Sequence, residues 1–457
     1  MKNVIYLIVF SMIIGCSSKV ETIKLNDDVL TQSIDSIIKA NYLPNEPGAA
    51  ILIIKDGKEI FAKGFGMANL ELNVPIKSEM IFRLGSITKQ FTAVSILILE
   101  EQGKLNIKDD IRKHLPSYPI HKKIITVENL LTHTSGIPSF TEFPNSFEIE
   151  QMKLTTNEIL DLFKDKPLDF EPGERFSYSN SGYDVLGAII ESVSGMTYED
   201  FVETEIFKKI GMKHSFYDHP EELVKNKILG YDKDSSGYRS AEYTTMCAAF
   251  SAGALRSNVR DLAIWNKSIH EGKLISVENL ARAFMPFKLN SGELSNYGFG
   301  WSSSTFLSHQ LYYHDGGILG FRSSGFYFPE EDIYTVILSN NTSSNPSYLN
   351  FLISSMILDE EINGSVKTDT NKIDLYSGTY EYNGNTISIT SDASSLSIDA
   401  PWQKGNLKAI ASNEFYIDGT IISCIFNQDS TGLVESITIK HRFIGDEWLT
   451  AVKSTKK

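Results

Sequence analysis

A serine and a lysine stand three residues apart in segment 81–90, as Ser86 and Lys89. The apolar run at 91–99 predicts a buried helix that ends near Gly103. Because residues i and i+3 share a helix face, the Lys89 amine can reach the Ser86 hydroxyl. A serine needs a base to become a nucleophile, and a helix start offers N–H groups for an oxyanion. The pair therefore predicts nucleophilic catalysis, while the alternative is that Ser86 only caps the helix.

The spacing Ser-x-x-Lys proves little alone, because it also occurs at 36–39 and 454–457. Two further motifs distinguish Ser86. Tyr178-Ser179-Asn180 begins 92 residues later, and His314-Asp315-Gly316 begins a further 136 residues along the chain. Phenol, amide and imidazole groups can transfer protons or hydrogen-bond a substrate. The three motifs together predict one site assembled from distant segments.

In this order, the motifs resemble those of the penicillin-recognising serine hydrolases, and most closely the class C beta-lactamase-related esterases and peptidases. Longer segments extend the resemblance over residues 29–360. They are LLTHTSGI (130–137), EPGERFSYSNSGY (171–183), IFKKIGM (206–212), SAGAL (251–255), YGFGW (297–301) and HDGGILGF (314–321). The resemblance implies an α+β fold of the beta-lactamase/transpeptidase type, in which an antiparallel sheet flanked by helices lies beside an all-helical lobe.

The resemblance also implies roles for individual residues. Ser86 would attack a carbonyl carbon and form an acyl-enzyme, Lys89 would take or relay its proton, and Tyr178 would pass a proton to the leaving group. The substrate-binding residues would be Asn180, His314, Gly316 and Gly317. The N–H groups of Ser86 and Gly317 would form the oxyanion hole, where losing one donor typically costs about 3 to 4 kcal/mol.

Two points about this chemistry stay open from the sequence. A free lysine has a pKa of about 10.4, so neutralising Lys89 at pH 7 costs about 4 to 5 kcal/mol unless burial offsets it. The alternative is a charged Lys89 that only orients Ser86. Asp315 stands where the family pattern has Thr or Ser, and a carboxylate there would repel a beta-lactam carboxylate if it faced the cleft. His314 also carries less charge than the lysine of penicillin-binding members, so we expect weak penicillinase activity at most.

Periodicity places these residues on a plausible framework. Strands are expected at 51–54 and 60–65, joined by an Asp56-Gly57 turn, and again at 312–316, 323–328 and 333–339. Helices are expected at 29–38, 127–132, 183–193, 262–269 and 348–358. Strands at both ends of a domain with helices between them predict a mixed sheet completed by distant segments.

Beyond residue 360 the pattern changes. Segment 361–372 is polar and indicates a linker. Short alternating runs at 375–389, 395–398, 414–417, 421–426, 434–441 and 448–452 then predict a small all-β, barrel-like domain over 373–457. No catalytic constellation is evident within it.

The N-terminus resembles a bacterial lipoprotein signal. A cationic start precedes an apolar run at 4–14, which is too short to span a bilayer and ends before Gly15-Cys16. We expect a signal peptide at 1–15, lipidation of Cys16 and a polar tether at 16–28. The protein would then lie outside the cytoplasm in the bacterial cell envelope, periplasmic or at the surface. The alternative is an ordinary signal peptide in which Cys16 is incidental.

Composition restricts the partners. The formal net charge of −14 disfavours nucleic acid and anionic membrane surfaces. None of the nine histidines has H-x-x-x-H or H-x-H spacing, so we expect no metal, and no nucleotide or other cofactor motif is present. The oligomeric state stays open.

These observations favour a membrane-anchored serine hydrolase that acts through an acyl-enzyme on esters, small amides or peptides. Two enzyme alternatives are a D-amino-acid-specific peptidase or carboxypeptidase on cell-wall peptides, and a weak beta-lactamase. A third alternative is a non-catalytic, penicillin-binding-like lipoprotein.

Overall fold

The computed structural model describes residues 27–120, 123–360, 373–392, 395–444 and 447–454. The predicted signal peptide (1–15), Cys16 and the linker (361–372) lie outside these residues, as does all but the end of the tether at 16–28. The first helix, α1, begins at Asp27. In the described part of the chain, no helix combines the length and apolarity needed to cross a bilayer.

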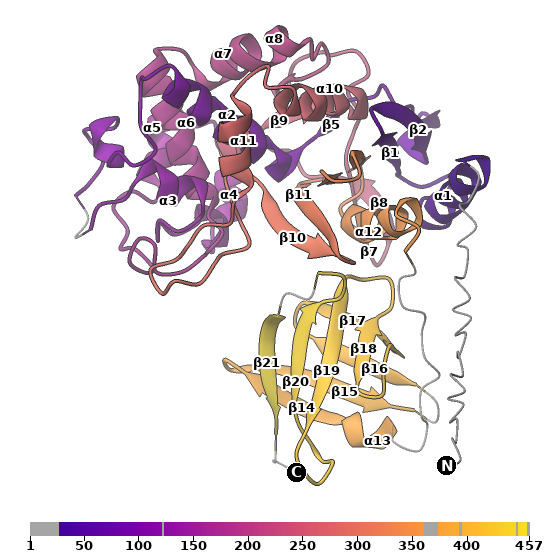
Figure 1. The fold of residues 1–457 in the computed structure, drawn as a ribbon. Coiled ribbons are helices and arrows are strands. Elements are labelled where there is room, and N and C mark those ends of the chain that lie inside the picture. Colours follow the sequence, from indigo (N-terminus) through magenta and orange to yellow (C-terminus); the bar gives the residue numbers. More distant parts are fainter. Residues whose placement is uncertain (1–26, 121–122, 361–372, 393–394, 445–446, 455–457) are drawn as a thin grey trace, which may run out of the picture.

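A six-stranded antiparallel sheet forms the centre of the first domain (Figure 1). In spatial order its strands are β10 (Ser302–Phe306), β11 (His309–Ile318), β12 (Phe321–Phe328), β13 (Ile333–Ser339), β1 (Ala49–Lys55) and β2 (Lys58–Phe65). The N-terminal hairpin joins the late strands because β1 pairs with β13, with Ala49 opposite Ser339. The predicted completion of the sheet by segments from both ends of the domain is confirmed. The sheet is antiparallel throughout, as the family resemblance implies, and not mixed as the strand pattern alone predicts.

The two faces of this sheet pack against different helices, because alternate residues of a strand point to opposite faces. Ala49, Ile51 and Ile53 share a core with α1 (Asp27–Asn41) and α12 (Pro346–Ile357). Ala50 and Leu52 belong to the larger core, which includes α2 (Thr88–Glu101) and α10 (Val259–His270). Helix α11 (Val277–Phe284) packs on α10.

The helical lobe lies at one end of the sheet (Figure 1). Its helices are α3 (Val127–Leu131), α4 (Ser146–Glu150), α5 (Thr156–Asp161), α6 (Asn180–Ser194), α7 (Tyr198–Val202), α8 (Lys208–Ile210) and α9 (Phe250–Gly253). Thr126 caps α3 and Ser179 caps α6, each through a side-chain oxygen that accepts from a backbone N–H. The cap at Ser179 starts α6 at Asn180. It therefore holds Tyr178 and Asn180, the neighbours of Ser179 in the tyrosine motif, at a fixed helix start.

Short strands connect these parts. They are β3 (Met67–Asn69), β4 (Val74–Pro75), β5 (Phe82–Arg83), β6 (Phe216–Tyr217), β7 (Tyr231–Asp234), β8 (Gly237–Ser240) and β9 (Leu255–Ser257). Strand β9 lies between β5 and β6. There the buried Asp218 carboxylate lies 2.8 Å from the Arg83 guanidinium and 2.6 Å from that of Arg256. This ion-pair cluster fixes the strand immediately before Ser86.

The second domain is a closed antiparallel barrel of eight strands, as the sequence predicts. The strands are β14 (Gly378–Tyr382), β15 (Asn385–Ser391), β16 (Leu396–Ala400), β17 (Gln403–Ala409), β18 (Glu414–Ile417), β19 (Ile422–Gln428), β20 (Val434–His441) and β21 (Glu447–Lys453), preceded by α13 (Ile373–Tyr376). Pairing of β14 with β21 closes the barrel.

The barrel contacts the first domain through Phe443, which follows β20. The Phe443 ring packs 4.9 Å from that of Phe351 on α12 and 6.0 Å from that of Phe306 on β10. It belongs to the same apolar core as α1 and α12. The barrel therefore docks on the sheet face that α1 and α12 cover.

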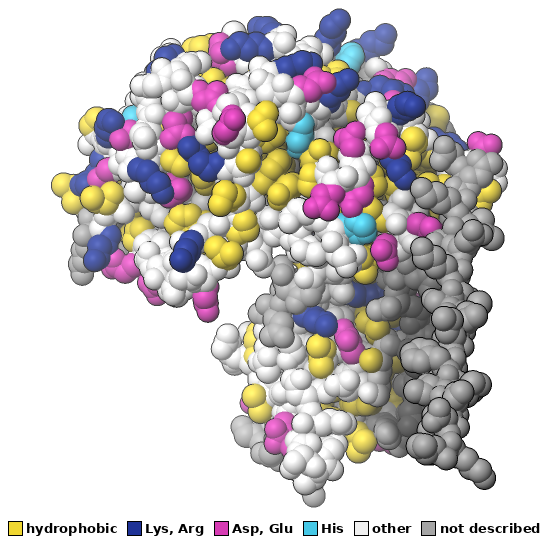
Figure 2. All heavy atoms as spheres, in the orientation of Figure 1, with side chains coloured by type: hydrophobic (Ala, Val, Ile, Leu, Met, Phe, Trp, Pro, Cys, Tyr) yellow, Lys and Arg dark blue, Asp and Glu magenta, His cyan; other side chains and the backbone are white. Residues whose placement is uncertain are grey.

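Charged side chains of both signs are interspersed over the upper domain in the view of Figure 2. Among the described residues, several exposed side chains form ion pairs, for example Arg260 with Glu59 and Lys273 with Glu271. Exposed pairs of this kind contribute little stability, typically about 0 to 1 kcal/mol each.

Candidate active site

Ser86 lies in a 3-10 turn, Gly85–Ile87, which leads directly into α2. Leu84 is the N-cap residue of the 3-10 turn, and Ile87 is the N-cap residue of α2. Neither side chain makes a capping hydrogen bond. The alternative that Ser86 is a helix cap is therefore wrong. Its neighbours are buried, whereas Ser86 itself is half-buried and faces a cavity.

Lys89 is completely buried one turn further along. Its Nζ donates to Asn180 Oδ1 at 2.7 Å and to the Ala252 carbonyl at 2.9 Å, and it lies 3.2 Å from Ser86 Oγ. The two carbonyl oxygens can only accept, so they use two N–H bonds of the amine. The third position of Nζ faces Ser86, where a neutral amine presents its lone pair to the hydroxyl.

Burial lowers the pKa of Lys89 from its usual value to about 7, although the Asp184 carboxyl opposes this change. Asp184 is also fully buried, on α6 one turn after Asn180. Burial raises the pKa of Asp184 well above its usual value, and Lys89 opposes that rise. A substantial share of neutral Lys89 is thus available near neutral pH.

Tyr178 lies against Lys89 and Ser86. Its ring centroid is 4.8 Å from Lys89 Nζ and 4.2 Å from the His133 ring. His133 Nδ1 accepts a hydrogen bond from the Ser179 N–H at 3.0 Å, which ties the tyrosine segment to the loop after α3. The family loop that contains His133 therefore positions Tyr178.

Burial raises the pKa of Tyr178 well above its usual value, and a hydrogen bond with the Ser86 hydroxyl opposes the rise. The phenol therefore keeps its proton throughout the neutral range. A protonated phenol beside the nucleophile can donate or relay a proton, while the neighbouring amine can accept one.

Asn180 connects Lys89 to the helical lobe. Besides accepting from Lys89, it donates through Nδ2 to Thr141 Oγ1 at 3.1 Å. Its backbone N–H donates to Ser139 Oγ. These bonds fix which amide atom faces Lys89, and the sequence-based expectation that Asn180 hydrogen-bonds Lys89 agrees with this geometry.

Gly316 and Gly317 bring strand β11 against the turn that carries Ser86. A Cβ on Gly316 would lie 2.1 Å from the Leu84 carbonyl oxygen, so no side chain fits there. Gly85 has φ of +53°, and a Cβ on it would lie 2.9 Å from the Gly317 nitrogen. Gly317 lines the cavity beside Ser86, so its backbone is next to the place where an oxyanion would form.

His314 is buried beside Tyr178 rather than on the cavity wall. Its Nδ1 lies 2.6 Å from the Asp315 carbonyl and its Nε2 lies 2.9 Å from the Tyr297 hydroxyl. The carbonyl can only accept, so Nδ1 carries the proton and Tyr297 donates to Nε2. Burial, with the nearby Lys89 charge, lowers the pKa of His314 to about 3. His314 is therefore neutral and supplies no charge to a substrate.

Asp315 points to the opposite face of the sheet, as strand alternation requires. Burial raises the pKa of its carboxyl to about 6, and the nearby Ser324 and Ser347 hydroxyls, the latter on α12, oppose the rise. It faces away from the cavity, so it cannot repel a bound carboxylate in the way the sequence left open.

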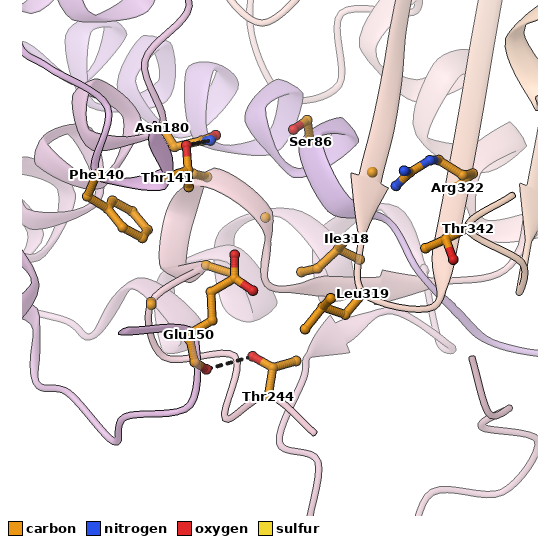
Figure 3. A pocket seen from close by; sticks show the side chains of 15 residues that line it. Ser86, Phe140, Thr141, Glu150, Asn180, Thr244, Ile318, Leu319, Arg322 and Thr342 are labelled. Carbon is orange, nitrogen blue, oxygen red and sulfur yellow. Dashed lines mark hydrogen bonds between the residues drawn. The ribbon is translucent and has the colours of Figure 1, made fainter. Parts of the chain in front are cut away.

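A cavity of about 500 Å³ opens beside Ser86 (Figure 3). Its walls come from the helical lobe, the loop before α9 and the β11–β12 turn. The lining residues with polar side chains are Ser86, Thr141, Glu150, Asn180, Thr244, Arg322 and Thr342. No cluster of three or more potential metal ligands occurs among the residues that the structure describes.

Four residues of this region are absent from the sequence-based predictions: Asp184, Tyr297, Glu150 and Arg322. Asp184 had one usable signal, because it stands four residues after Asn180 and so shares its helix face. Glu150 and Arg322 reach the cavity only through tertiary packing, and no local pattern marks them. Tyr297 lies in a segment that was matched for similarity, without a role for its hydroxyl.

Comparison with known proteins identifies the family of the chain. The family model described as Beta-lactamase matches residues 39–350. Among curated proteins, penicillin-binding protein 4* of Bacillus subtilis (strain 168) is 31% identical over 308 residues, or 64% of this chain and 67% of its own length. Protein flp of Staphylococcus aureus (strain MRSA252) is 28% identical over 319 residues, which cover 68% of this chain and 63% of flp. The chain thus spans slightly less than two thirds of flp.

Among solved structures, the octameric penicillin-binding protein homologue from Pyrococcus abyssi has a TM-score of 0.67 and 27% identity, covering 94% of this chain and 100% of its own. The D-amino acid amidase from Ochrobactrum anthropi SV3 complexed with D-phenylalanine has a TM-score of 0.64 and 23% identity over 72% of this chain and 99% of its own, which shows a shared fold. With the matched family covering most of the first domain, the chain belongs to the beta-lactamase family of serine hydrolases.

Proposed function

We propose that this protein hydrolyses esters, small amides or peptides through an acyl-enzyme on Ser86. Neutral Lys89 takes the Ser86 proton as Oγ attacks the carbonyl carbon. The backbone N–H groups of Ser86 and Gly317 stabilise the oxyanion. Tyr178 donates a proton to the leaving group and regains one from the attacking water during deacylation. Protonated Lys89 returns its proton to the departing Ser86 Oγ, so the net reaction adds one water molecule across the scissile bond.

One observation carries this proposal: Lys89 Nζ is buried, held by two acceptor oxygens and 3.2 Å from Ser86 Oγ. A surface lysine in a chance Ser-x-x-Lys sequence would keep its charge in water and would need no such partners. Burial with two carbonyl acceptors and one hydroxyl is the arrangement that a general base requires.

The test combines labelling with turnover. A fluorophosphonate probe should label the wild-type protein, and peptide mass spectrometry should place the adduct on Ser86. Ser86→Ala should abolish labelling and hydrolysis of a short-chain chromogenic ester. The matched control is Ser36→Ala, which alters the same Ser-x-x-Lys spacing on the surface helix α1 and should leave both signals intact. Absence of labelling and turnover in the wild type would instead favour the non-catalytic binding protein.

The same preparation can separate the enzyme alternatives. A D-alanyl peptide, a chromogenic cephalosporin and the ester are compared by kcat/KM. We expect the ester or peptide to exceed the cephalosporin, because the neutral His314 cannot pair with a beta-lactam carboxylate. Cephalosporin turnover equal to that of the ester would favour the beta-lactamase alternative.

We also propose that the protein is anchored to a membrane of the cell envelope by lipid on Cys16. Support comes from the N-terminal sequence alone, namely the short apolar run and the following Gly15-Cys16. Metabolic labelling with a fatty acid should modify the wild type but not Cys16→Ser, which should move to the soluble envelope fraction. Equal fractionation of the two proteins would favour an ordinary signal peptide.

A further inference from the structure

The cavity beside Ser86 carries an acidic side chain that the proposed chemistry does not use. Glu150 ends α4 in the helical lobe, and its carboxyl points into the cavity in Figure 3. Its backbone carbonyl is engaged, because it accepts from the Thr244 hydroxyl at 2.8 Å and from the Thr245 N–H. The chain therefore fixes the backbone of Glu150 and leaves the side chain directed at the cavity.

In the part of the chain that the structure describes, the Glu150 carboxyl has no charged partner. Its side-chain oxygens make no ion pair and no hydrogen bond with any described residue, although Glu150 is half-buried. Burial raises its pKa above the usual value, with no cation nearby to oppose the rise. A partly desolvated carboxylate without a partner is unfavourable, and a bound cation would restore what it has lost.

The other charged group of the cavity is compensated differently. Arg322 lies on β12, at the Gly317 end of the cavity. Burial lowers the pKa of Arg322, and the Asp232 carboxylate opposes this change, so its charge has an acidic neighbour within the protein. The net charge of −14 for the whole chain attracts cations rather than anions.

The position of the cavity indicates which part of a substrate would meet Glu150. Tyr178, the proposed proton donor to the leaving group, packs with His133, His314 and Tyr297 and is not on the cavity wall. The leaving group must lie next to the Tyr178 hydroxyl. The cavity is left for the acyl group, which remains attached to Ser86 after the first step.

We infer that Glu150 is a specificity residue that binds a protonated amine on the acyl group, so that the preferred substrates are aminoacyl esters or amides. This inference rests on the proposed function of Ser86. An ammonium group placed against a half-buried carboxylate forms a charge-assisted hydrogen bond, which typically corresponds to about 10- to 100-fold in kcat/KM.

The test uses two esters of nearly the same shape. Alanine methyl ester carries an ammonium where methyl isobutyrate carries a methyl group, and both release an acid that a pH-stat measures. We expect the wild type to prefer D- or L-alanine methyl ester by about 10- to 100-fold. Glu150→Gln should bring this preference ratio close to one. The matched control is Glu148→Gln on the exposed side of α4, which should keep the wild-type ratio.

A second comparison uses methyl 6-aminohexanoate and methyl heptanoate. It tests whether Glu150 binds an amine next to the ester carbonyl or an amine several carbons away from it. A preference for the amine in either pair, lost in Glu150→Gln, supports the inference. Equal turnover of charged and neutral esters by the wild type, or an unchanged ratio in Glu150→Gln, overturns it while leaving Ser86 hydrolysis intact. Failure of every ester together with no fluorophosphonate adduct on Ser86 counts against both proposals.

Discussion

The proposed base predicts a specific dependence of acylation on pH. With the Lys89 pKa at about 7, the neutral fraction of its amine rises from about 1% at pH 5 to about 90% at pH 8. Only the neutral amine can accept the Ser86 proton, so kcat/KM for a neutral ester should rise about 90-fold over this interval. A neutral substrate is chosen so that the charge state of Glu150 has little influence.

Other groups around Lys89 do not produce a rise of kcat/KM between pH 5 and pH 8. Burial raises the pKa of Tyr178 well above its usual value, and lowers the pKa of His314 to about 3 and that of His133 well below its usual value. None of the three therefore changes charge between pH 5 and 9. Asp184, whose pKa burial raises, acts on Lys89 through its charge and opposes the loss of the Lys89 proton, so the two groups titrate together.

The decisive variant is Lys89→Arg, because a guanidinium stays protonated over this range. Activity should fall at every pH, and the acid limb should disappear from what remains. Lys39→Arg, in the exposed Ser-x-x-Lys sequence on α1, is the matched control and should keep the wild-type profile. A wild-type rate that is flat from pH 5 to 9, or an acid limb that survives in Lys89→Arg, would refute the assignment of Lys89 as the base.

Three further substitutions test the framework. Gly316→Ala forces a Cβ to within 2.1 Å of the Leu84 carbonyl oxygen, just before the turn that carries Ser86, so fluorophosphonate labelling should slow by about 100-fold or more. The control Gly325→Ala places a Cβ no closer than 3.7 Å to any neighbour, so this variant should be labelled at the wild-type rate. Asp218→Asn leaves two arginines buried without their counter-charge and should lower the free energy of unfolding by about 3 to 5 kcal/mol in urea titrations; a change below about 1 kcal/mol would contradict this reading. Phe443→Ala removes the aromatic contact between the domains, so small-angle scattering should show a larger radius of gyration with esterase activity unchanged, and an unaltered radius would argue that other contacts hold the barrel.

Motif residues were predictable because their chemistry is tied to local spacing. Ser86 and Lys89 are one helical turn apart, and Asn180 follows the helix cap of Ser179, so sequence alone places their side chains. Strands β1 and β13 were predictable because they are apolar runs, and β12 because residues 323–328 are short, rich in β-forming side chains and followed by turn residues. Strand β10 is serine-rich and β17 contains Gly405 and Asn406, so neither shows the alternation that predicts a strand; pairing with neighbours orders them.

Charge states and cavity walls could not be predicted in this way. The low pKa of His314 depends on burial and on the nearby Lys89 charge, and the pKa of Lys89 is lowered by burial against the opposing effect of Asp184. Glu150 faces Ser86 across a cavity only because α4 folds back toward the segment near Thr244. These properties come from tertiary packing between distant segments, which a single sequence does not display.

The pairing of β1 with β13 also constrains when the domain can fold. The Gly48 N–H donates to Asn340 Oδ1 at 2.8 Å across 292 positions of sequence, and the whole β1–β13 ladder lies at similar separation. Contacts so remote in sequence form slowly, because the intervening chain must be closed into a loop first. During synthesis the N-terminal hairpin has no partner until residues 333–339 emerge, so the chain stays incompletely folded until then. Any truncation before those residues leaves an open, apolar strand edge that invites aggregation.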